Sequence, residues 1–336
     1  MTDNLKTQFK PNLDEPLPLP QSGSWPAAVH TFDEDSVLAI QTAMAAGRPL
    51  LIRGEPGIGK SQLARAAAEF LKAPLITHVI NARAESEDLL YTYDAVSRLA
   101  RAQLMASLGD RTLGDEDIKS ELAEKLYVRP GCLWWAFDWQ SAEAQAELCR
   151  VGALQPESPE EWQQDRVGCV VLIDEIDKAD TDVPNSLLES LGNTGFYVPY
   201  TQKSIALLKG SPRPLVIITT NEERELPAAF LRRCLVYQMS LPPGRDAQLE
   251  YLKQRGKVHF PNGDIAENTY LAAAEQLLRD REDARQYGLV RPGCAEYLDL
   301  LTALAELCPS DAAAQRNLLD KIGKFALRKN PEGDAA

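Results

Sequence analysis

The sequence has few of the residues that build metal sites and disulfide frameworks. Its six cysteines are scattered without a Cys-x-x-Cys pair, and only three histidines occur in 336 residues. This scatter favours buried thiols in a reducing compartment over disulfides or zinc, and the shortage of histidine argues against a histidine-based metal site. No stretch is long and apolar enough to span a bilayer, and the N-terminus has no signal-type apolar core. We therefore expect a cytoplasmic protein without a membrane partner.

Positive charge is also in short supply. The chain has 36 Lys and Arg against 49 Asp and Glu, which gives a net charge of −13. Binding to a nucleic-acid backbone needs a basic surface, so we do not expect nucleic acid as a partner. A local basic patch, for instance inside a ring pore, is still compatible with the negative net charge. The length exceeds that of one ordinary domain and fits two unequal ones.

A glycine-rich turn follows the first strongly apolar run. Residues 50–52 suit a buried strand, and apolar side chains recur at helical spacing after residue 61. The turn between them has the pattern Gly-x-x-x-x-Gly-Lys-Ser and comprises Gly54, Glu55, Pro56, Gly57, Ile58, Gly59, Lys60 and Ser61. A strand, this pattern and a helix in succession are typical of a phosphate-binding loop.

Each part of this loop has a physical task. The glycines let the backbone turn its N–H groups toward an anion, and the helix that starts near Lys60 adds its positive end. Lys60 can reach the β- and γ-phosphates of a nucleoside triphosphate, and the Ser61 hydroxyl can bind Mg²⁺. We predict that residues 54–61 and the adjoining Gln62 contact a nucleotide.

A second apolar run ends in two acids. Residues 167–173 are typical of a strand buried on both faces of a parallel sheet, and Asp174 and Glu175 follow them. Ligand-binding groups gather at the C-terminal ends of strands in open α/β sheets. We therefore predict that Asp174 holds Mg²⁺, directly or through water, and that Glu175 is the base that activates the attacking water.

Polar side chains later in the chain complete the candidate site. Asn221 follows the apolar strand 214–220, where its amide can bond both γ-phosphate and water. Arg232 and Arg233 lie on a short predicted helix, and either can reach a neighbouring subunit and stabilise transition-state charge. Arg291 precedes a predicted helix near the C-terminus and can touch the phosphates. For these arginines the sequence supports an ordinary surface or capping role about as well.

Alternating strands and helices give way to helices alone after Pro242–Gly244. This change predicts an α/β domain over 25–241 and a small helical lid over 245–330. Residues 1–24 contain four prolines among polar residues and favour a flexible arm, the alternative being packing along a neighbouring subunit. The remaining expectations are a long helix from Glu85, a hairpin over 196–208, core packing (rather than partner binding) of the aromatic cluster 133–139, and Ser310 as an N-cap.

With these motifs in this order, the chain resembles an AAA+ ATPase. The particular run Glu223–Cys234, with Arg129–Gly131 and Glu175–Ala179, resembles the MoxR-like group. The resemblance implies a parallel sheet of strand order 5-1-4-3-2 in a three-layer sandwich, ATP and Mg²⁺ as cofactors, and a homo-oligomeric, commonly hexameric, ring. It assigns sensor 1 to Asn221, arginine fingers to Arg232 and Arg233, and sensor 2 to Arg291.

The resemblance also suggests a biological task. It places an insert in helix 2 at about 91–130 and a pre-sensor hairpin at about 196–210, and it implies chaperone-like remodelling of a partner, often a protein with a von Willebrand factor A domain. Residues 139–168 separate Arg129–Gly131 from the acidic strand by more residues than in typical members of the group. The stretch Tyr91–Val96 and the Trp-rich cluster point to a distinct subgroup, whose relatives sit beside effector or conflict-type proteins. Two alternatives stay open: a nucleotide-gated switch, and a motor that acts on nucleic acid in a defence system.

Overall fold

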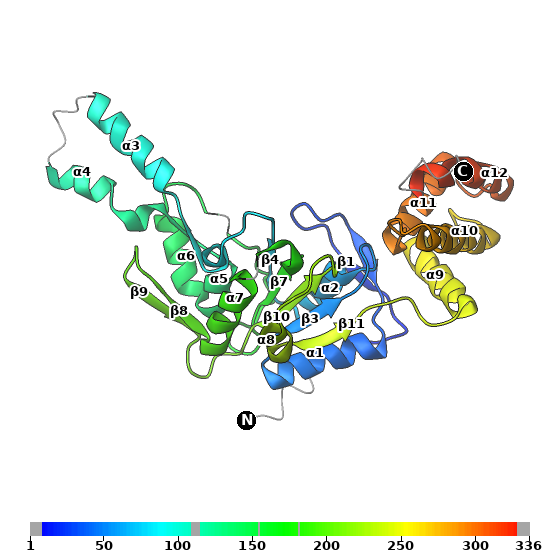
Figure 1. The fold of residues 1–336 in the computed structure, drawn as a ribbon, viewed down its shortest axis with the longest axis horizontal. Coiled ribbons are helices and arrows are strands. Elements are labelled where there is room, and N and C mark those ends of the chain that lie inside the picture. Colours follow the sequence, from blue (N-terminus) through cyan, green and yellow to red (C-terminus); the bar gives the residue numbers. More distant parts are fainter. Residues whose placement is uncertain (1–8, 109–114, 154, 181, 328–336) are drawn as a thin grey trace. The chain divides into compact units, whose positions relative to one another are not determined.

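The computed structural model describes residues 9–108, 115–153, 155–180 and 182–327 (Figure 1). The chain folds as two compact units, each built from segments that are separate in the sequence. Unit 1 comprises Met1–Lys10, Val37–Ile52 and Ala67–Tyr237, and unit 2 comprises Pro11–Ser36, Arg53–Ala66 and Gln238–Ala336.

A five-stranded sheet organises the first two-thirds of the chain. Its strands are β3 (Leu50–Arg53), β4 (Leu75–Val79), β7 (Val170–Asp174), β10 (Leu215–Thr220) and β11 (Leu235–Gln238). The spatial order β11-β3-β10-β7-β4 confirms the expected order 5-1-4-3-2. β7 pairs in parallel with both β4 and β10, so its apolar residues are buried on both faces and its C-terminal end lies beside that of β10.

Helices cover the sheet in the three-layer arrangement that the sequence predicted (Figure 1). They are α1 (Glu34–Ala46), α2 (Lys60–Leu71), α5 (Cys132–Phe137), α6 (Trp139–Leu148), α7 (Asp182–Asn193) and α8 (Ala228–Arg233). Side chains of α5 and α7 join those of β4, β7 and β10 in one hydrophobic core, in which Trp134 has no exposed surface. The aromatic cluster therefore packs in the core, as expected.

Residues 139–168 extend this aromatic packing. The ring of Trp139 lies edge-on to Trp135 at 5.0 Å and to Trp162 at 4.8 Å, measured between ring centroids. The indole N–H of Trp162 donates to the carbonyl of Val167. The irregular segment before β7 is thus fixed to the domain by indole contacts, because large aromatic rings bury much surface even where the backbone is irregular.

The expected long helix from Glu85 is wrong. A 3-10 turn, η1 (Ser86–Leu89), comes first, and β5 (Tyr91–Tyr93) then pairs antiparallel with β6 (Val128–Pro130). The helix α3 (Ala95–Leu108) starts only after Asp94, whose carboxylate accepts from the N–H of Ser97 at 2.8 Å. The segment continues with α4 (Asp115–Glu121) and η2 (Glu124–Tyr127), and the later hairpin consists of β8 (Gly195–Val198) and β9 (Lys203–Ala206).

The flexible arm expected over residues 1–24 is contradicted for residues 9–24, and residues 1–8 lie outside the described residues. Phe9 is 1% exposed and packs edge-on against Phe70. β1 (Leu17–Leu19) pairs with β2 (Ala28–His30) in an antiparallel ribbon. The prolines concealed a short strand: Pro16 and Pro20 flank β1 and Pro18 lies within it, which a strand at the edge of a two-stranded ribbon tolerates.

The C-terminal part of unit 2 is helical. Its helices are α9 (Arg245–His259), α10 (Glu267–Gln286), α11 (Cys294–Leu307) and α12 (Ala312–Ala326), and they bury a core that includes Leu252, Tyr297 and Leu301. The N-cap of α12 is Asp311, whose carboxylate accepts from Ala313 and Ala314, so the expected Ser310 cap is off by one residue. Within the described ranges, we find no helix with the length and apolarity needed to cross a bilayer.

Candidate active site

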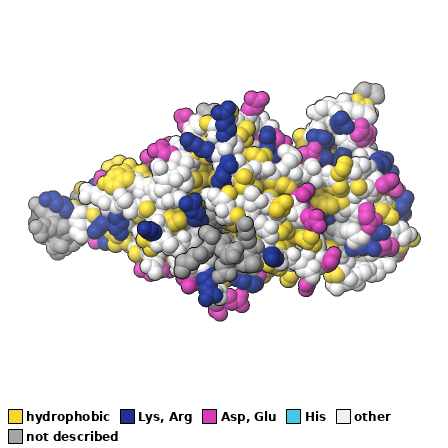
Figure 2. Space-filling model, turned by 90° about the horizontal axis from the view of Figure 1, so that it is seen from below, with side chains coloured by type: hydrophobic (Ala, Val, Ile, Leu, Met, Phe, Trp, Pro, Cys, Tyr) yellow, Lys and Arg dark blue, Asp and Glu magenta, His cyan; other side chains and the backbone are white. Residues whose placement is uncertain are grey.

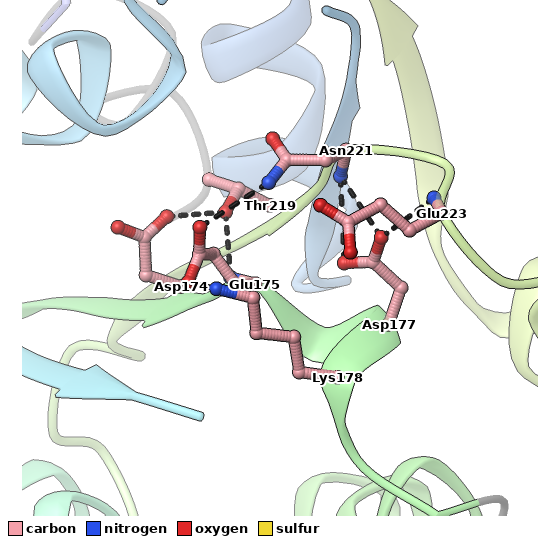
Figure 3. Close-up of polar contacts among 7 residues, drawn as sticks. All are labelled: Asp174, Glu175, Asp177, Lys178, Thr219, Asn221 and Glu223. Atoms are coloured by element: carbon pink, nitrogen blue, oxygen red, sulfur yellow. Dashed lines mark hydrogen bonds and ion pairs between the residues drawn. The ribbon is translucent and has the colours of Figure 1, made fainter. Parts of the chain in front are cut away.

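The C-terminal ends of β7 and β10 bring four predicted or adjacent polar side chains together in unit 1 (Figure 3). Thr219 is fully buried, and its hydroxyl donates to Asp174 Oδ1 while accepting from the N–H of Glu175 at 3.0 Å. Because Thr219 fixes one carboxylate oxygen of Asp174, the other oxygen has a defined direction. Sequence reasoning placed Asp174 here but gave Thr219 no role.

Glu175 has a constrained backbone. Its φ of 61° and ψ of 48° lie in the left-handed region, which a non-glycine residue adopts only when its surroundings impose it. Its side chain is held at both oxygens: Asn221 Nδ2 donates to Oε1 at 3.2 Å, and Lys178 Nζ lies 2.5 Å from Oε2. The structure thus brings Glu175 and Asn221, both predicted site residues, into direct contact.

Asp177 holds the loop after β10 in place. Its carboxylate is 2% exposed and accepts from the backbone N–H of Asn221 at 3.2 Å and of Glu223 at 2.9 Å. A buried carboxylate needs such donors, since an unpaired one would carry a large desolvation cost. Asp177 therefore positions Asn221 through the main chain.

The two candidate finger arginines lie at the end of α8 with exposed side chains. In the part of the chain that the structure describes, neither guanidinium forms an ion pair. The carbonyl groups of Arg232, Arg233 and Cys234 instead accept from the guanidinium of Arg48, at 2.5, 3.1 and 3.1 Å. Arg48 caps this six-residue helix at its negative end and so fixes the backbone from which both arginines project.

The phosphate-loop pattern belongs to unit 2 and forms the turn that its glycines require. Gly57 has a φ of 73° and Gly59 a φ of 107°, which residues with a Cβ rarely adopt. Lys60 opens α2, is 6% exposed, and donates from Nζ to the carbonyls of Gly54 at 2.8 Å and Glu55 at 2.9 Å. The ammonium group is therefore held beside the loop.

The helical part of unit 2 contacts this loop directly. The N–H of Ala295, in the first turn of α11, donates to the carbonyl of Gly57 at 3.1 Å. Glu55 forms two ion pairs, from Oε1 to Arg291 Nη2 at 2.6 Å and from Oε2 to Arg281 Nη2 at 2.5 Å. The structure thus places Arg291, for which the sequence predicted contact with the phosphates, at Glu55 of the phosphate loop, together with Arg281, which the sequence did not single out.

His30 is a buried neighbour of the loop segment. It is 3% exposed, and its ring lies edge-on to Phe32 at 4.7 Å. Burial, followed by the charges of Arg255 and His259, lowers the pKa of His30 to about 3. Neither ring nitrogen has a hydrogen-bond partner among the described residues. His30 is therefore neutral at physiological pH.

The loop residues of unit 2 fit the phosphates of a nucleoside triphosphate, and each unit has an oxygen donor that suits Mg²⁺. A turn that a Cβ would obstruct is suited to phosphate oxygens, and Lys60 and Arg291 supply positive charge beside it. The carboxylate of Asp174 and the hydroxyl of Ser61 are oxygen donors of the kind that Mg²⁺ prefers.

The family model for the AAA domain of the dynein-related subfamily matches residues 49–234, more than half of the 336 residues. The chain belongs to this family. It is accordingly a nucleotide-binding ATPase of the P-loop class, an enzyme that hydrolyses ATP.

Two solved structures resemble this AAA ATPase. A point mutant of RuvB from Thermotoga maritima is 13% identical, with 86% of this chain and 68% of that chain covered and a TM-score of 0.44. A protein described as a "putative ATPase" from Cytophaga hutchinsonii is 14% identical, with 89% and 83% covered and a TM-score of 0.36. A comparison with curated proteins gives no match.

Sequence reasoning missed four residues that contact predicted site residues: Arg48, Asp177 and Thr219 in unit 1, and Arg281 in unit 2. Thr219 could have been found, because it is a hydroxyl-bearing residue at the end of the apolar strand β10 and precedes Asn221 by two positions. Arg48 and Arg281 left no such signal, since they act on partners that are 184 and 226 residues away in the sequence.

Proposed function

We propose that this AAA ATPase is a MoxR-like, ring-forming remodeller that couples hydrolysis of Mg²⁺-bound ATP to work on a protein partner. The observation that carries the proposal is the cluster of Asp174, Glu175, Thr219 and Asn221 at the ends of two neighbouring strands (Figure 3). A carboxylate base held by an amide that can also reach water suits a water attack on phosphorus.

Each residue has a defined part in the proposed reaction. Residues 54–62 bind the phosphates, Lys60 and Arg291 balance their negative charge, and Asn221 orients the attacking water while Glu175 accepts its proton. Ser61 and Asp174 would hold Mg²⁺, which supplies charge neutralisation at the β- and γ-phosphate oxygens. Thr219 and Asp177 keep Asp174 and Asn221 in position.

The exposed arginines of α8 support an assembly in which neighbouring copies complete each other's sites. Arg232 and Arg233 project into solvent from a helix that Arg48 caps, with no acidic partner among the described residues. A guanidinium in this situation is available to the γ-phosphate bound by a neighbouring copy. We therefore propose a homo-oligomeric ring, with six subunits as the commonest arrangement for such chains.

Exposed apolar side chains support a protein partner. On α3, Val96 is 79% exposed, Leu99 is 60% exposed and Leu104 is 48% exposed. An unpartnered apolar stripe of this kind commonly marks a protein-binding face, and a protein with a von Willebrand factor A domain is the partner class that the MoxR resemblance implies. Figure 2 shows basic and acidic side chains interspersed on the face that it draws, which favours a protein over nucleic acid.

The Glu175→Gln variant tests the proposed chemistry. It keeps the shape of the side chain and removes the base, so we expect ATP binding to persist and turnover to fall by about 10²- to 10⁴-fold. Glu223→Gln is the matched control, because Glu223 lies in the same cluster and contributes its backbone N–H, not its carboxylate, to Asp177. Turnover by Glu175→Gln at the level of the control would remove Glu175 from the role of base.

Light scattering with and without a non-hydrolysable ATP analogue tests the ring. We expect a mass of several subunits that the analogue stabilises, and a monomer under both conditions would contradict assembly. Hydrolysis that stays slow until a protein partner is added would instead support a nucleotide-gated switch, and stimulation by DNA that falls steeply with salt would support a nucleic-acid motor.

A further inference from the structure

The acidic residue inside the phosphate loop poses an electrostatic problem. The loop pattern leaves its second position open, and this chain has Glu55 there. A carboxylate beside a bound triphosphate repels the phosphates, and the repulsion is strong where protein excludes water. An acid at this position therefore needs a compensating cation that stays in place when nucleotide binds.

Arg281 has the geometry of such a cation. Its Nη2 donates to Glu55 Oε2 at 2.5 Å, and its Nη1 donates to the carbonyl of Pro292 at 2.5 Å. The side chain is 15% exposed, which makes it the most buried member of the Glu55 cluster, since Glu55 is 32% exposed and Arg291 is 44% exposed. Two bonds and low exposure fix the Arg281 guanidinium more firmly than that of Arg291.

Arg291 shares the same carboxylate but is held differently. Its ion pair within the described residues is to Glu55 Oε1, at 2.6 Å, and nearly half of its side chain faces solvent. A carboxylate with one pair to each of two guanidinium groups can release the more exposed one while it keeps the other. Arg291 can then turn to a phosphate at the loop without leaving Glu55 unpaired.

We propose that Arg281 is a positioning residue for nucleotide binding: it neutralises Glu55 and so leaves Arg291 available to the terminal phosphate of a nucleoside triphosphate. This inference rests on the proposed role of the phosphate loop. It adds Arg281 to the residues that support nucleotide binding and predicts a larger effect on triphosphate than on diphosphate affinity. Arg281 acts through Glu55 and does not touch the nucleotide.

The surroundings of Arg281 supply a matched control. A pocket of about 390 Å³ is lined by Arg245, Arg281, Arg285 and Arg291, with Glu282 among other residues. Arg285 lies one helical turn after Arg281 on α10, and within the described residues it forms no ion pair with Glu55. Arg281→Gln and Arg285→Gln remove the same charge from the same pocket, so the comparison separates the Glu55 contact from a general loss of positive charge.

The experiment measures equilibrium affinity for a non-hydrolysable ATP analogue and for ADP in the full-length chain. We expect Arg281→Gln to weaken the analogue by about tenfold, because Glu55 then faces the phosphates with Arg291 as its sole counter-charge. The affinity of Arg281→Gln for ADP should fall by less, about threefold at most, because ADP has one phosphate fewer for Glu55 to repel. Arg285→Gln should stay within about twofold of the unmodified chain, because it leaves the pairs of Glu55 intact.

The double variant Glu55→Gln/Arg281→Gln decides between positioning and mere structural damage. Removing the carboxylate removes the need for its partner, so the double variant should bind the analogue as Glu55→Gln does, within about twofold. If the double variant binds the analogue as weakly as Arg281→Gln alone does, the proposal is overturned. The proposal is also overturned if Arg285→Gln lowers the affinity for the analogue as much as Arg281→Gln does.

Failure of the proposed nucleotide site would be visible separately. If the unmodified chain and Lys60→Ala bind the analogue equally poorly, the phosphate loop itself has no such role and the proposal falls with it. If the unmodified chain binds and Lys60→Ala does not, the site stands, and the Arg281 comparison then tests the positioning role alone.

Discussion

Replacing Arg48 should weaken catalysis without weakening nucleotide binding. Arg48 donates to the last carbonyl groups of α8, and these belong to Arg232, Arg233 and Cys234. In Arg48→Gln these acceptors lose a cationic donor at the negative end of the helix. The side chains of Arg232 and Arg233 then project from a less ordered backbone, although their own charges are unchanged.

The magnitude follows from the exposure of these contacts. A hydrogen bond to a charged donor contributes about 1.5–3 kcal/mol when buried, but Arg48 is exposed, and we reduce this to about 0.5 kcal/mol for each bond. The three bonds then sum to about 1.5 kcal/mol, which lowers the melting temperature of a unit of this size by about 3 °C. A finger arginine that is displaced but present should cost about tenfold in kcat, far less than its removal.

Steady-state hydrolysis, nucleotide affinity and thermal unfolding together check the prediction. Arg213→Gln is the control, because Arg213 lines the same 330 Å³ pocket as Arg48, and its one backbone contact is a weak one to Gly47 at 3.5 Å. We expect kcat to fall in Arg48→Gln while the affinity for an ATP analogue is unchanged. If Arg213→Gln lowers kcat equally, or if Arg48→Gln lowers affinity and kcat together, the capping argument is refuted.

Two further predictions follow from the ionisable groups. Lys178→Gln frees one carboxylate oxygen of Glu175, so kcat should rise about twofold. The effect is small because the Lys178 side chain is 40% exposed, which weakens the ion pair. A fall in kcat would show that the pair helps catalysis. Burial lowers the pKa of His30 to about 3, so below pH 6.5 the unfolded chain gains a proton that the folded chain does not. The free energy of unfolding should therefore fall between pH 6.5 and pH 5. In urea unfolding, His30→Phe should reduce that fall by about 2 kcal/mol. The same pH dependence in the variant and the unmodified chain would contradict a buried neutral His30.

The sequence predicted the sheet well because its central strands β3, β7 and β10 are buried on both faces. Runs such as 170–173 and 215–218 are apolar throughout, which a parallel sheet requires, and the polar residues that follow them mark the edge where ligands bind. Short-range patterns also predicted the hairpin of β8 and β9. Such local signals also supplied the list of candidate site residues, whose roles remain predictions.

Predictions from local sequence patterns failed where a short turn or strand interrupts a longer stretch of helical spacing. The apolar residues after Glu85 have helical spacing, yet a 3-10 turn and β5 precede the helix because β6, about 35 residues later, pairs with β5. The N-terminal segment was misjudged for a related reason, since Phe9 and Leu19 find their burial against residues far along the chain. No window of ten residues contains those partners.

Because local patterns do not show distant partners, the sequence indicates that Glu55 needs a nearby cation but does not identify that cation. An acid within a phosphate loop implies a nearby cation on electrostatic grounds alone. The sequence of α10 offers Arg279, Arg281 and Arg285, and helical spacing sets Arg281 and Arg285 on one face. Only the fold distinguishes them, because Arg279 pairs with residues of its own helix while Arg281 reaches Glu55 and the Pro292 carbonyl. A charge pattern thus predicts that compensation exists, and tertiary packing decides which residue provides it.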